Sequence, residues 1–248
     1  MAATDGEVGH PTSIPALLAR NARVYAAQPA WREKEFGIWQ VWTWAEGAAE
    51  IRAIALGLMA LGLERGDHVA VIGRNRPALY WSMIAAQMCG AVPVPLYQDA
   101  TGDEMTYVLD HCGARFVVCG DQEQADKVIE VQERLHHIDQ VVYVDKRGMR
   151  KYDHSRMNAL ADVVAEGKAA HNRFDAELDA RIVIGRDAVM TGERHFKAAA
   201  KGETVERHCD WLAAGFEFTQ RAVEGKAGFE LFFFQFVLRL FLLLTAAA

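Results

Sequence analysis

The feature that most constrains the fold is an alternation of short apolar runs with longer helical stretches between residues 67 and 144. The apolar runs are rich in β-branched residues and lack polar alternation, as expected for parallel strands that helices cover on both faces. The helical stretches begin at Pro77, Thr101 and Asp121. The strand-like runs lie at residues 68–72, 91–94, 116–118 and 141–144. Four strands joined by three crossovers predict an α/β fold with a doubly wound, mostly parallel sheet.

A hairpin is predicted ahead of this sheet. Residues 31–35 and 38–42 are two strand-like runs, and only Phe36 and Gly37 separate them. Two strands joined by a two-residue connection that contains glycine are typical of a β-hairpin.

Two helices are predicted with well-defined starts. Thr43 and Glu46 have the spacing of a capping box, and apolar residues then recur at helical spacing until Gly62. This pattern predicts an amphipathic helix of about four to five turns. Thr101 and Glu104 repeat the same capping spacing before a second amphipathic stretch.

Composition restricts the partners and the compartment. The chain has 248 residues and a net charge of −6, with no block of Lys and Arg that could neutralise a run of phosphates. Nucleic-acid binding therefore has little support, and small molecules or proteins are the expected partners. The four cysteines form no C-x-x-C pair, which fits a reducing, cytoplasmic location, and the first ten residues show no secretory signal.

The loops at the carboxyl ends of the predicted strands are where ligand chemistry is expected. In the first loop, Arg74 and Arg76 at a helix N-terminus could hold an anion. Alternatively, Gly73 makes the turn, Asn75 caps the helix and Pro77 takes its first position. We favour the structural alternative because the loop lacks the glycines of a phosphate cradle.

A series of short motifs follows one order along the chain. The motifs are Arg32-Glu33-Lys34, Gly37-Ile38-Trp39-Gln40, Thr43-Trp44, Gly57-Leu58, Leu61-Gly62-Leu63, Arg65-Gly66-Asp67-His68-Val69-Ala70, Asn75-Arg76-Pro77, Gly90-Ala91-Val92, Leu96-Tyr97-Gln98-Asp99, Tyr107-Val108-Leu109, Asp121-Gln122-Glu123-Gln124 and Val142-Tyr143. This ordered set resembles the opening of AMP-forming acyl-CoA synthetases, especially the long-chain fatty-acid type. The resemblance implies the first part of the large N-terminal domain of an adenylate-forming enzyme.

The resemblance also implies a reaction and its cofactors. Such an enzyme uses ATP and Mg²⁺ to convert a fatty acid to an acyl-adenylate, releases pyrophosphate, and transfers the acyl group to coenzyme A. A loop rich in Gly, Ser and Thr must then hold the phosphates through backbone N–H groups, and a lysine must stabilise developing charge.

The sequence departs from that family where the phosphate loop is expected, shortly after Arg186. Residues 186–190 still resemble the approach to the loop, but residues 191–197 contain one glycine, no Ser/Thr cluster and no proline. Thr191 and Gly192 with Lys197 could form a degenerate loop, although an ordinary helix N-terminus with a surface lysine is favoured. The family's adenine motif, ribose-binding aspartate and C-terminal lysine domain are also missing, so we expect an inactive fragment.

We expect residues 13–186 to form the N-terminal part of an AMP-binding domain and residues 187–248 to form a divergent, helical tail. The stretch from Phe229 to Leu244 is strongly apolar but is interrupted by charged residues. It could be a transmembrane anchor, a peripheral membrane contact, or a helix packed on exposed core. A shifted reading frame or early stop after about Met190 is the interpretation we favour, because the departure coincides with the phosphate loop and does not recover.

Three groups of polar residues could supply metal ligands or a nucleophile with its base, but each has a simpler interpretation. Adjacent residues of a helix point about 100° apart, which favours a solvated helix end for the first group. Contact of a histidine with the last carbonyls of a helix suits the second group, and the third lacks zinc-finger spacing. The groups are His136-His137-Ile138-Asp139, then Asp110-His111-Cys112, then His195 with His208 and Cys209. We therefore assign no catalytic, cofactor-binding or metal residue from the sequence.

Three functional hypotheses follow. The first is a fragment related to ATP-dependent long-chain fatty acid–CoA ligases that cannot adenylate alone. The second is a non-catalytic module that contacts a membrane or a protein through the Phe-rich tail. The third is an active ligase with a rewritten phosphate loop, which we rank last because the phosphates would have too few donors.

Overall fold

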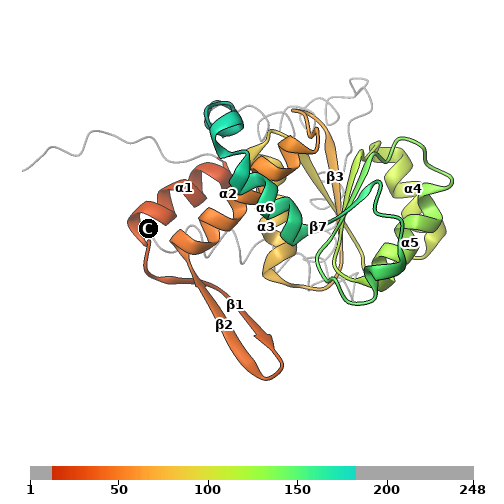
Figure 1. The fold of residues 1–248 in the computed structure, drawn as a ribbon, viewed down its shortest axis with the longest axis horizontal. Coiled ribbons are helices and arrows are strands. Elements are labelled where there is room, and N and C mark those ends of the chain that lie inside the picture. The colour runs from red at the N-terminus through yellow and green to blue at the C-terminus, as the bar shows by residue number, and fades with distance from the viewer. Residues whose placement is uncertain (1–12, 183–248) are drawn as a thin grey trace, which may run out of the picture.

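The computed structural model describes residues 13–182, and a five-stranded parallel sheet forms its centre (Figure 1). The strand order is β4-β3-β5-β6-β7, and every neighbouring pair is parallel. The strands are β3 (His68–Ile72), β4 (Val92–Leu96), β5 (Phe116–Cys119), β6 (Gln140–Tyr143) and β7 (Met157–Ala159). The four predicted strands are confirmed to within two residues at each end, and β7 is a fifth strand that was not predicted.

Helices cover both faces of this sheet (Figure 1). One face packs against α4 and α5, and the other packs against α2, α3 and α6, with α1 beside α2 and α3. The bounds are α1 (Ile14–Val24), α2 (Trp44–Ala60), α3 (Pro77–Met88), α4 (Gly102–Cys112), α5 (Gln122–Gln132), the 3-10 turn η1 (Met149–Lys151) and α6 (Leu160–Ala169), followed by helical residues 171–182. Among the helices of residues 13–182, none combines the length and the apolar composition that a membrane span needs.

Alternate residues of the central strand β3 enter two separate apolar clusters. Val69 and Val71 belong to the cluster with α2 and α3, whereas Ala70 and Ile72 belong to the cluster with α4 and α5. All four are buried, and burying a side chain such as valine contributes about 1.5–3 kcal/mol. The two-sided burial explains why the strands lack polar alternation and confirms the doubly wound α/β fold.

Both predicted capping boxes are present. The Thr43 amide donates to Glu46 Oε2 at 2.9 Å, and the Glu46 amide donates to Thr43 Oγ1 at 3.2 Å. Thr101 and Glu104 make the same pair of bonds, at 2.8 and 3.4 Å. The bonds from the threonine backbone and side chain lower the pKa of each glutamate carboxyl. These contacts satisfy amides that the first helical turn leaves free, so α2 and α4 begin where the sequence predicted.

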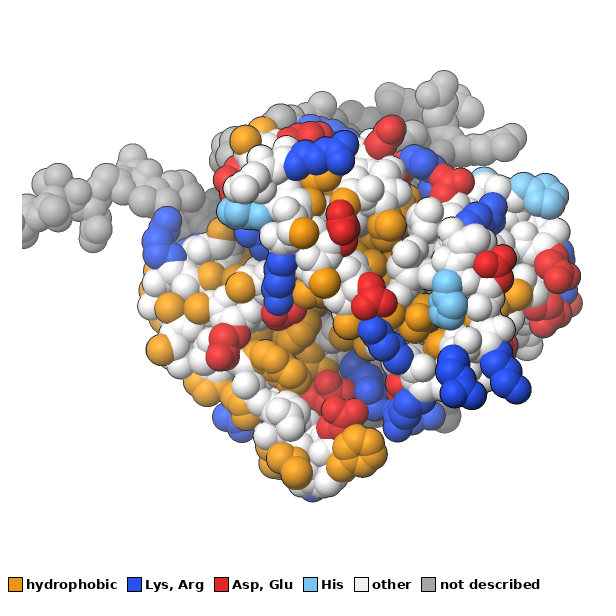
Figure 2. Space-filling model, viewed as in Figure 1, with side chains coloured by type: hydrophobic (Ala, Val, Ile, Leu, Met, Phe, Trp, Pro, Cys, Tyr) orange, Lys and Arg blue, Asp and Glu red, His pale blue; other side chains and the backbone are white. Residues whose placement is uncertain are grey.

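The predicted hairpin is also confirmed, and it projects from the body of the molecule (Figure 1). It consists of β1 (Pro29–Glu35) and β2 (Ile38–Thr43). Phe36 and Gly37 form the turn with φ angles of 48° and 82°. Figure 2 shows apolar side chains gathered at the free end of the hairpin.

Helices α2 and α6 cross with their backbones in close contact. A Cβ atom added to Gly167 would lie 1.9 Å from the carbonyl oxygen of Ala53, and one added to Gly57 would lie 2.1 Å from that of Val163. Real Cβ atoms do not approach backbone this closely, so glycine is required on both helices. This crossing holds α6 against the layer of helices that covers the sheet.

We predict that Gly167→Ala lowers the free energy of unfolding by about 1–3 kcal/mol, because the added methyl group forces the two helices apart. Gly102→Ala is a matched control, since the nearest atom to its added Cβ is a Glu130 side-chain oxygen at 3.8 Å. We expect this control to change stability by less than about 0.5 kcal/mol. Urea unfolding measures both values, and equal effects of the two substitutions would contradict the assigned helix crossing.

Candidate functional site

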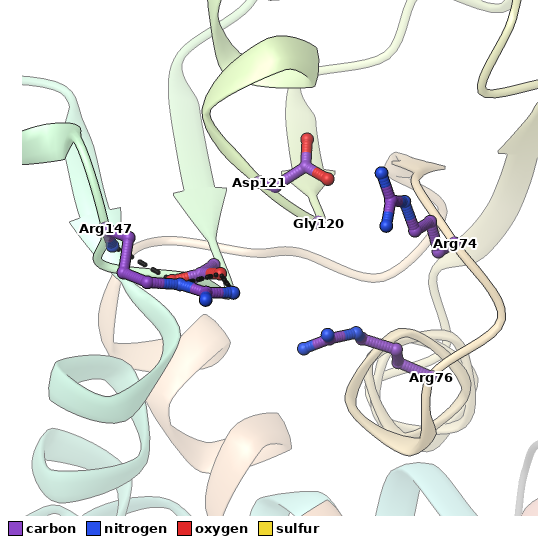
Figure 3. A pocket seen from close by; sticks show the side chains of 6 residues that line it. Arg74, Arg76, Gly120, Asp121 and Arg147 are labelled. Atoms are coloured by element: carbon purple, nitrogen blue, oxygen red, sulfur yellow. Dashed lines mark hydrogen bonds and ion pairs between the residues drawn. The ribbon is translucent and has the colours of Figure 1, made fainter. Parts of the chain in front are cut away.

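A small pocket of about 140 Å³ lies at the carboxyl edge of the sheet (Figure 3). The loops that follow β3, β5 and β6 form it. Its lining residues are Arg74, Arg76, Gly120, Asp121, Asp145 and Arg147. The sheet order places β4 on one side of β3 and β5 on the other, so the pocket lies at the topological switch point, where open α/β sheets bind ligands.

Two glycines bring the first two loops into contact. Gly73 has a φ of +148°, and a Cβ atom on it would lie 3.0 Å from Gly120 Cα. The Gly120 amide donates to the Ile72 carbonyl at 2.9 Å, which ties the end of β5 to the end of β3. The sequence prediction that Gly73 makes this turn is therefore confirmed, and Gly120 lies close against it, since a Cβ atom on Gly120 would be 3.3 Å from Gly73 Cα.

The start of α3 differs from the prediction in one respect. Pro77 does occupy the first turn, but the N-cap residue is Arg76, and it makes no side-chain capping bond. Asn75 Oδ1 instead accepts from the Tyr80 hydroxyl at 2.7 Å. The prediction that Asn75 caps the helix is wrong because Pro77 forces the residue immediately before it into an extended conformation, which is the conformation of an N-cap.

Two of the three arginines in the pocket are already paired with carboxylates. Arg76 Nε lies 3.3 Å from Glu33 Oε1, which reaches the pocket from the hairpin. Arg147 Nε donates to Asp145 Oδ2 at 2.8 Å. Hydrogen bonds from Arg147 lower the pKa of the Asp145 carboxyl, which outweighs the effect of its burial. These two guanidinium groups thus have part of their charge neutralised within the protein.

Arg74 is the exception. It is exposed at the pocket and forms no ion pair with any residue between 13 and 182. Figure 3 shows Arg74 and Arg76 extending toward the space between the three loops, with Asp121 opposite them. Asp121 caps α5 by accepting from the Gln124 amide at 3.3 Å. The pocket can therefore contact an anionic group through Arg74, while its other charged groups are engaged.

Sequence reasoning identified part of this pocket. Arg74 and Arg76 were considered as an anion site, and the structure brings them together with Arg147 and Asp145, which were missed. The sequence did contain a clue to Asp145 and Arg147, because both residues lie just after the end of the predicted fourth strand. Parallel strands place such residues at the same edge of the sheet as the loop after β3.

The histidine group after α5 has structural contacts. His137 Nε2 lies 3.2 Å from the Leu109 carbonyl oxygen, and Asp139 Oδ2 accepts from Arg115 Nε at 2.7 Å. His136 and His137 lie in the turn between α5 and β6, so the expectation of a helix end is wrong. Among the described residues, no three His, Cys, Asp or Glu side chains come together as potential metal ligands.

The group at the end of α4 is likewise structural. The rings of His111 and Tyr107 are stacked with their centroids 5.8 Å apart, and Cys112 is buried. Cys89 and Cys119 are also buried, and burial raises the pKa of each of these two thiols to about 12. Neither thiol would therefore be an anionic nucleophile near neutral pH. His195, His208, Cys209, the segment from Thr191 to Lys197 and the stretch from Phe229 to Leu244 lie outside the described residues.

Comparison with known proteins agrees with the fold and with the motifs. The model of the AMP-binding enzyme family matches residues 18–184. The chain therefore belongs to the AMP-binding enzyme family, which confirms the resemblance to acyl-CoA synthetases.

Curated relatives share this part of the chain. An uncharacterized protein of Mycobacterium tuberculosis is 35% identical over 99 residues, which cover 40% of this chain and 56% of that protein. The long-chain-fatty-acid–CoA ligase ACSBG2 of Xenopus laevis is 26% identical over 132 residues, covering 53% of this chain and 18% of the ligase. The long-chain-fatty-acid–CoA ligase FadD15 of Mycobacterium bovis is 27% identical over 148 residues, covering 59% of this chain and 24% of the ligase. The chain thus spans about half the length of the first relative and about a fifth of the ligases.

Solved structures share the fold. Acetoacetyl-CoA synthetase from Streptomyces lividans superposes with a TM-score of 0.55 at 19% identity, covering 61% of this chain and 24% of that enzyme. The N-terminal domain of FACL13 from Mycobacterium tuberculosis, solved with an inhibitor bound, gives a TM-score of 0.52 at 22% identity. The match covers 62% of this chain and 35% of that domain. The described part of the chain therefore has the fold of the first part of an adenylate-forming N-terminal domain.

The pairing of Asp145 with Arg147 predicts a measurable titration. The ordinary pKa of an aspartate carboxyl is 3.8, and that of Asp145 lies below it because Arg147 stabilises the anion. This stabilisation is present at neutral pH and is lost as the pH falls through the folded-state pKa. We predict that Arg147→Gln raises the pKa of Asp145 in an NMR titration and lowers stability at pH 7 by less than about 1 kcal/mol.

Lys146→Gln is the control for this titration, because Lys146 pairs with Asp162 rather than with Asp145. We expect the pKa of Asp145 to change little in this variant. Equal shifts in the two variants would mean that general loss of positive charge, and not the Arg147 contact, sets the pKa.

Proposed function

We propose that this chain is the N-terminal portion of a long-chain fatty acid–CoA ligase and that it does not form an acyl-adenylate by itself. Residues 13–186 would belong to the AMP-binding domain, and residues 187–248 would form a divergent tail. The observation that carries the proposal is the family match over residues 18–184, which stops just before the expected phosphate loop.

The charge of the pocket supports the second half of this proposal. A charge-assisted hydrogen bond contributes about 1.5–3 kcal/mol, whereas micromolar affinity requires about 8 kcal/mol of binding free energy. Of the three arginines that line the pocket, only Arg74 forms no ion pair with a residue of the described part of the chain. One such contact is too weak to hold a nucleotide triphosphate firmly.

The carboxylates of the pocket also fit Mg²⁺ poorly. Mg²⁺ is usually bound by one or two carboxylates together with the phosphates of the substrate. Asp121 is occupied as the cap of α5, and Asp145 is held by Arg147. These residues therefore fit a Mg²⁺–ATP complex only in part. In the complete ligase, ATP, Mg²⁺, coenzyme A and a fatty acid would meet residues outside the described part of this chain.

We predict that the purified chain releases no pyrophosphate above background when it is given ATP, Mg²⁺ and a long-chain fatty acid, with or without coenzyme A. A complete long-chain fatty acid–CoA ligase assayed in parallel is the positive control, and circular dichroism shows whether the chain is folded. Turnover that depends on the fatty acid would contradict the proposal. If that turnover disappeared in Lys197→Ala, the segment from Thr191 to Lys197 would be a working phosphate loop.

A further inference from the structure

The hairpin has one face toward the body of the molecule and one face away from it. Trp31 and Trp42 lie opposite each other on the two strands. Both pack edge-on against Trp81 of α3, with ring centroids 5.9 and 5.3 Å apart. Side chains alternate between the two faces of a strand. In the part of each strand between its tryptophan and the turn, the residues an odd number of positions from that tryptophan therefore point away from α3.

That outward face combines positive charge with apolar surface. Arg32 pairs with Val41, and Lys34 pairs with Trp39, so these four side chains share one face, which we name the outer hairpin face. Trp39 is 60% exposed and Val41 is 47% exposed. The Lys34 ammonium lies 5.8 Å from the centre of the Trp39 ring. The outer hairpin face contains no acidic residue.

The turn adds an exposed apolar tip. Phe36 is 84% exposed and Ile38 is 65% exposed. With positive φ at both Phe36 and Gly37, the connection has the geometry of a type I′ turn, which favours Asn-Gly. A phenylalanine at this position is locally unfavourable and packs little against the described residues. Because it gains so little within the protein, its ring is available for a contact outside it.

We propose that the outer hairpin face and the Phe36 tip dock on the surface of an anionic phospholipid bilayer. Arg32 and Lys34 would meet the lipid phosphates and anionic headgroups, while the Trp39 ring would lie at the interface and Phe36 would enter the acyl boundary. This combination of two cations with exposed aromatic rings matches a lipid surface in both charge and polarity.

The negative charge elsewhere on the chain does not prevent this contact. The chain carries a net charge of −6, but charges farther than about 10 Å from the bilayer are largely screened at an ionic strength of 0.1 M. The hairpin projects from the body, so its turn lies at the free end, away from the rest of the described residues (Figure 1). Both glutamates of the strands lie on the inner face by alternation: Glu33 pairs with Arg76, and the exposed Glu35 lies opposite Ile38 beside the turn.

A second copy of the chain fits this surface less well. A stable protein interface usually buries about 1,600 Å² in total, which the few side chains at the end of a two-stranded hairpin do not supply. Lipid binding needs only shallow insertion of one or two rings together with charge attraction. The bilayer is therefore the occupant that the size and charge of the surface favour.

The test is flotation of the full chain with vesicles made of equal parts phosphatidylcholine and phosphatidylserine, compared with vesicles of phosphatidylcholine alone. We expect binding to the anionic vesicles that weakens as salt rises. The double variant R32Q/K34Q should bind on the order of 10- to 30-fold more weakly, because each Lys or Arg near an anionic surface raises the affinity about 3- to 5-fold. The matched control R150Q/K151Q removes the same charge from exposed residues elsewhere and should bind like the wild type.

Phe36→Asn separates lipid binding from folding. Asn-Gly suits a type I′ turn, so this variant should fold at least as well as the wild type and yet bind the vesicles more weakly.

Failure of the wild type to bind anionic vesicles would overturn the proposal. Unchanged binding by the hairpin variants would also overturn it, and would assign the lipid contact to another segment such as that from Phe229 to Leu244. If the hairpin variants instead changed only the sedimentation of a dimer, the face would be an interface between copies. No nucleotide is present, so the outcome is independent of the proposed ligase relationship.

Discussion

The contact between Gly73 and Gly120 is the constraint on which the candidate site depends. It joins the ends of β3 and β5 at the point where the chain changes its direction of winding across the sheet. A side chain on Gly73 would separate these loops and would also be strained at a φ of +148°. The close approach therefore fixes where Arg74 and Asp121 face each other, and it does so through backbone geometry rather than through charge.

The hairpin and the pocket are linked through α3. Trp31 and Trp42 of the hairpin pack edge-on against Trp81 of α3. Glu33 of the hairpin pairs with Arg76 at the start of the same helix. The body side of the hairpin thus supports the pocket, while its other side faces outward. The described part of the chain thus has two separate exposed features, the pocket that contains Arg74 and the outer hairpin face.

Local patterns in the sequence predicted most of the sheet, because short β-branched runs and capping boxes depend mainly on neighbouring residues. The strand β7 was missed since Met157–Ala159 contains no β-branched residue and is defined by its pairing with β6. Arg147 and Asp145 were missed because their relation to Arg74 is spatial. The error at Asn75 has a local cause: the effect of Pro77 on the preceding residue outweighed the usual preference for Asn as a cap.

Within residues 13–182, the pocket at the edge of the sheet offers the phosphates of ATP a single guanidinium group that is free of an ion pair, and we propose that this is too little to hold the nucleotide. Calorimetric titration of ATP with Mg²⁺ into the folded chain tests it most directly. We expect no binding in the micromolar range, because only one guanidinium group of the described pocket is free of an internal ion pair. Micromolar binding would contradict the account and would mean that residues beyond this pocket form a working phosphate site.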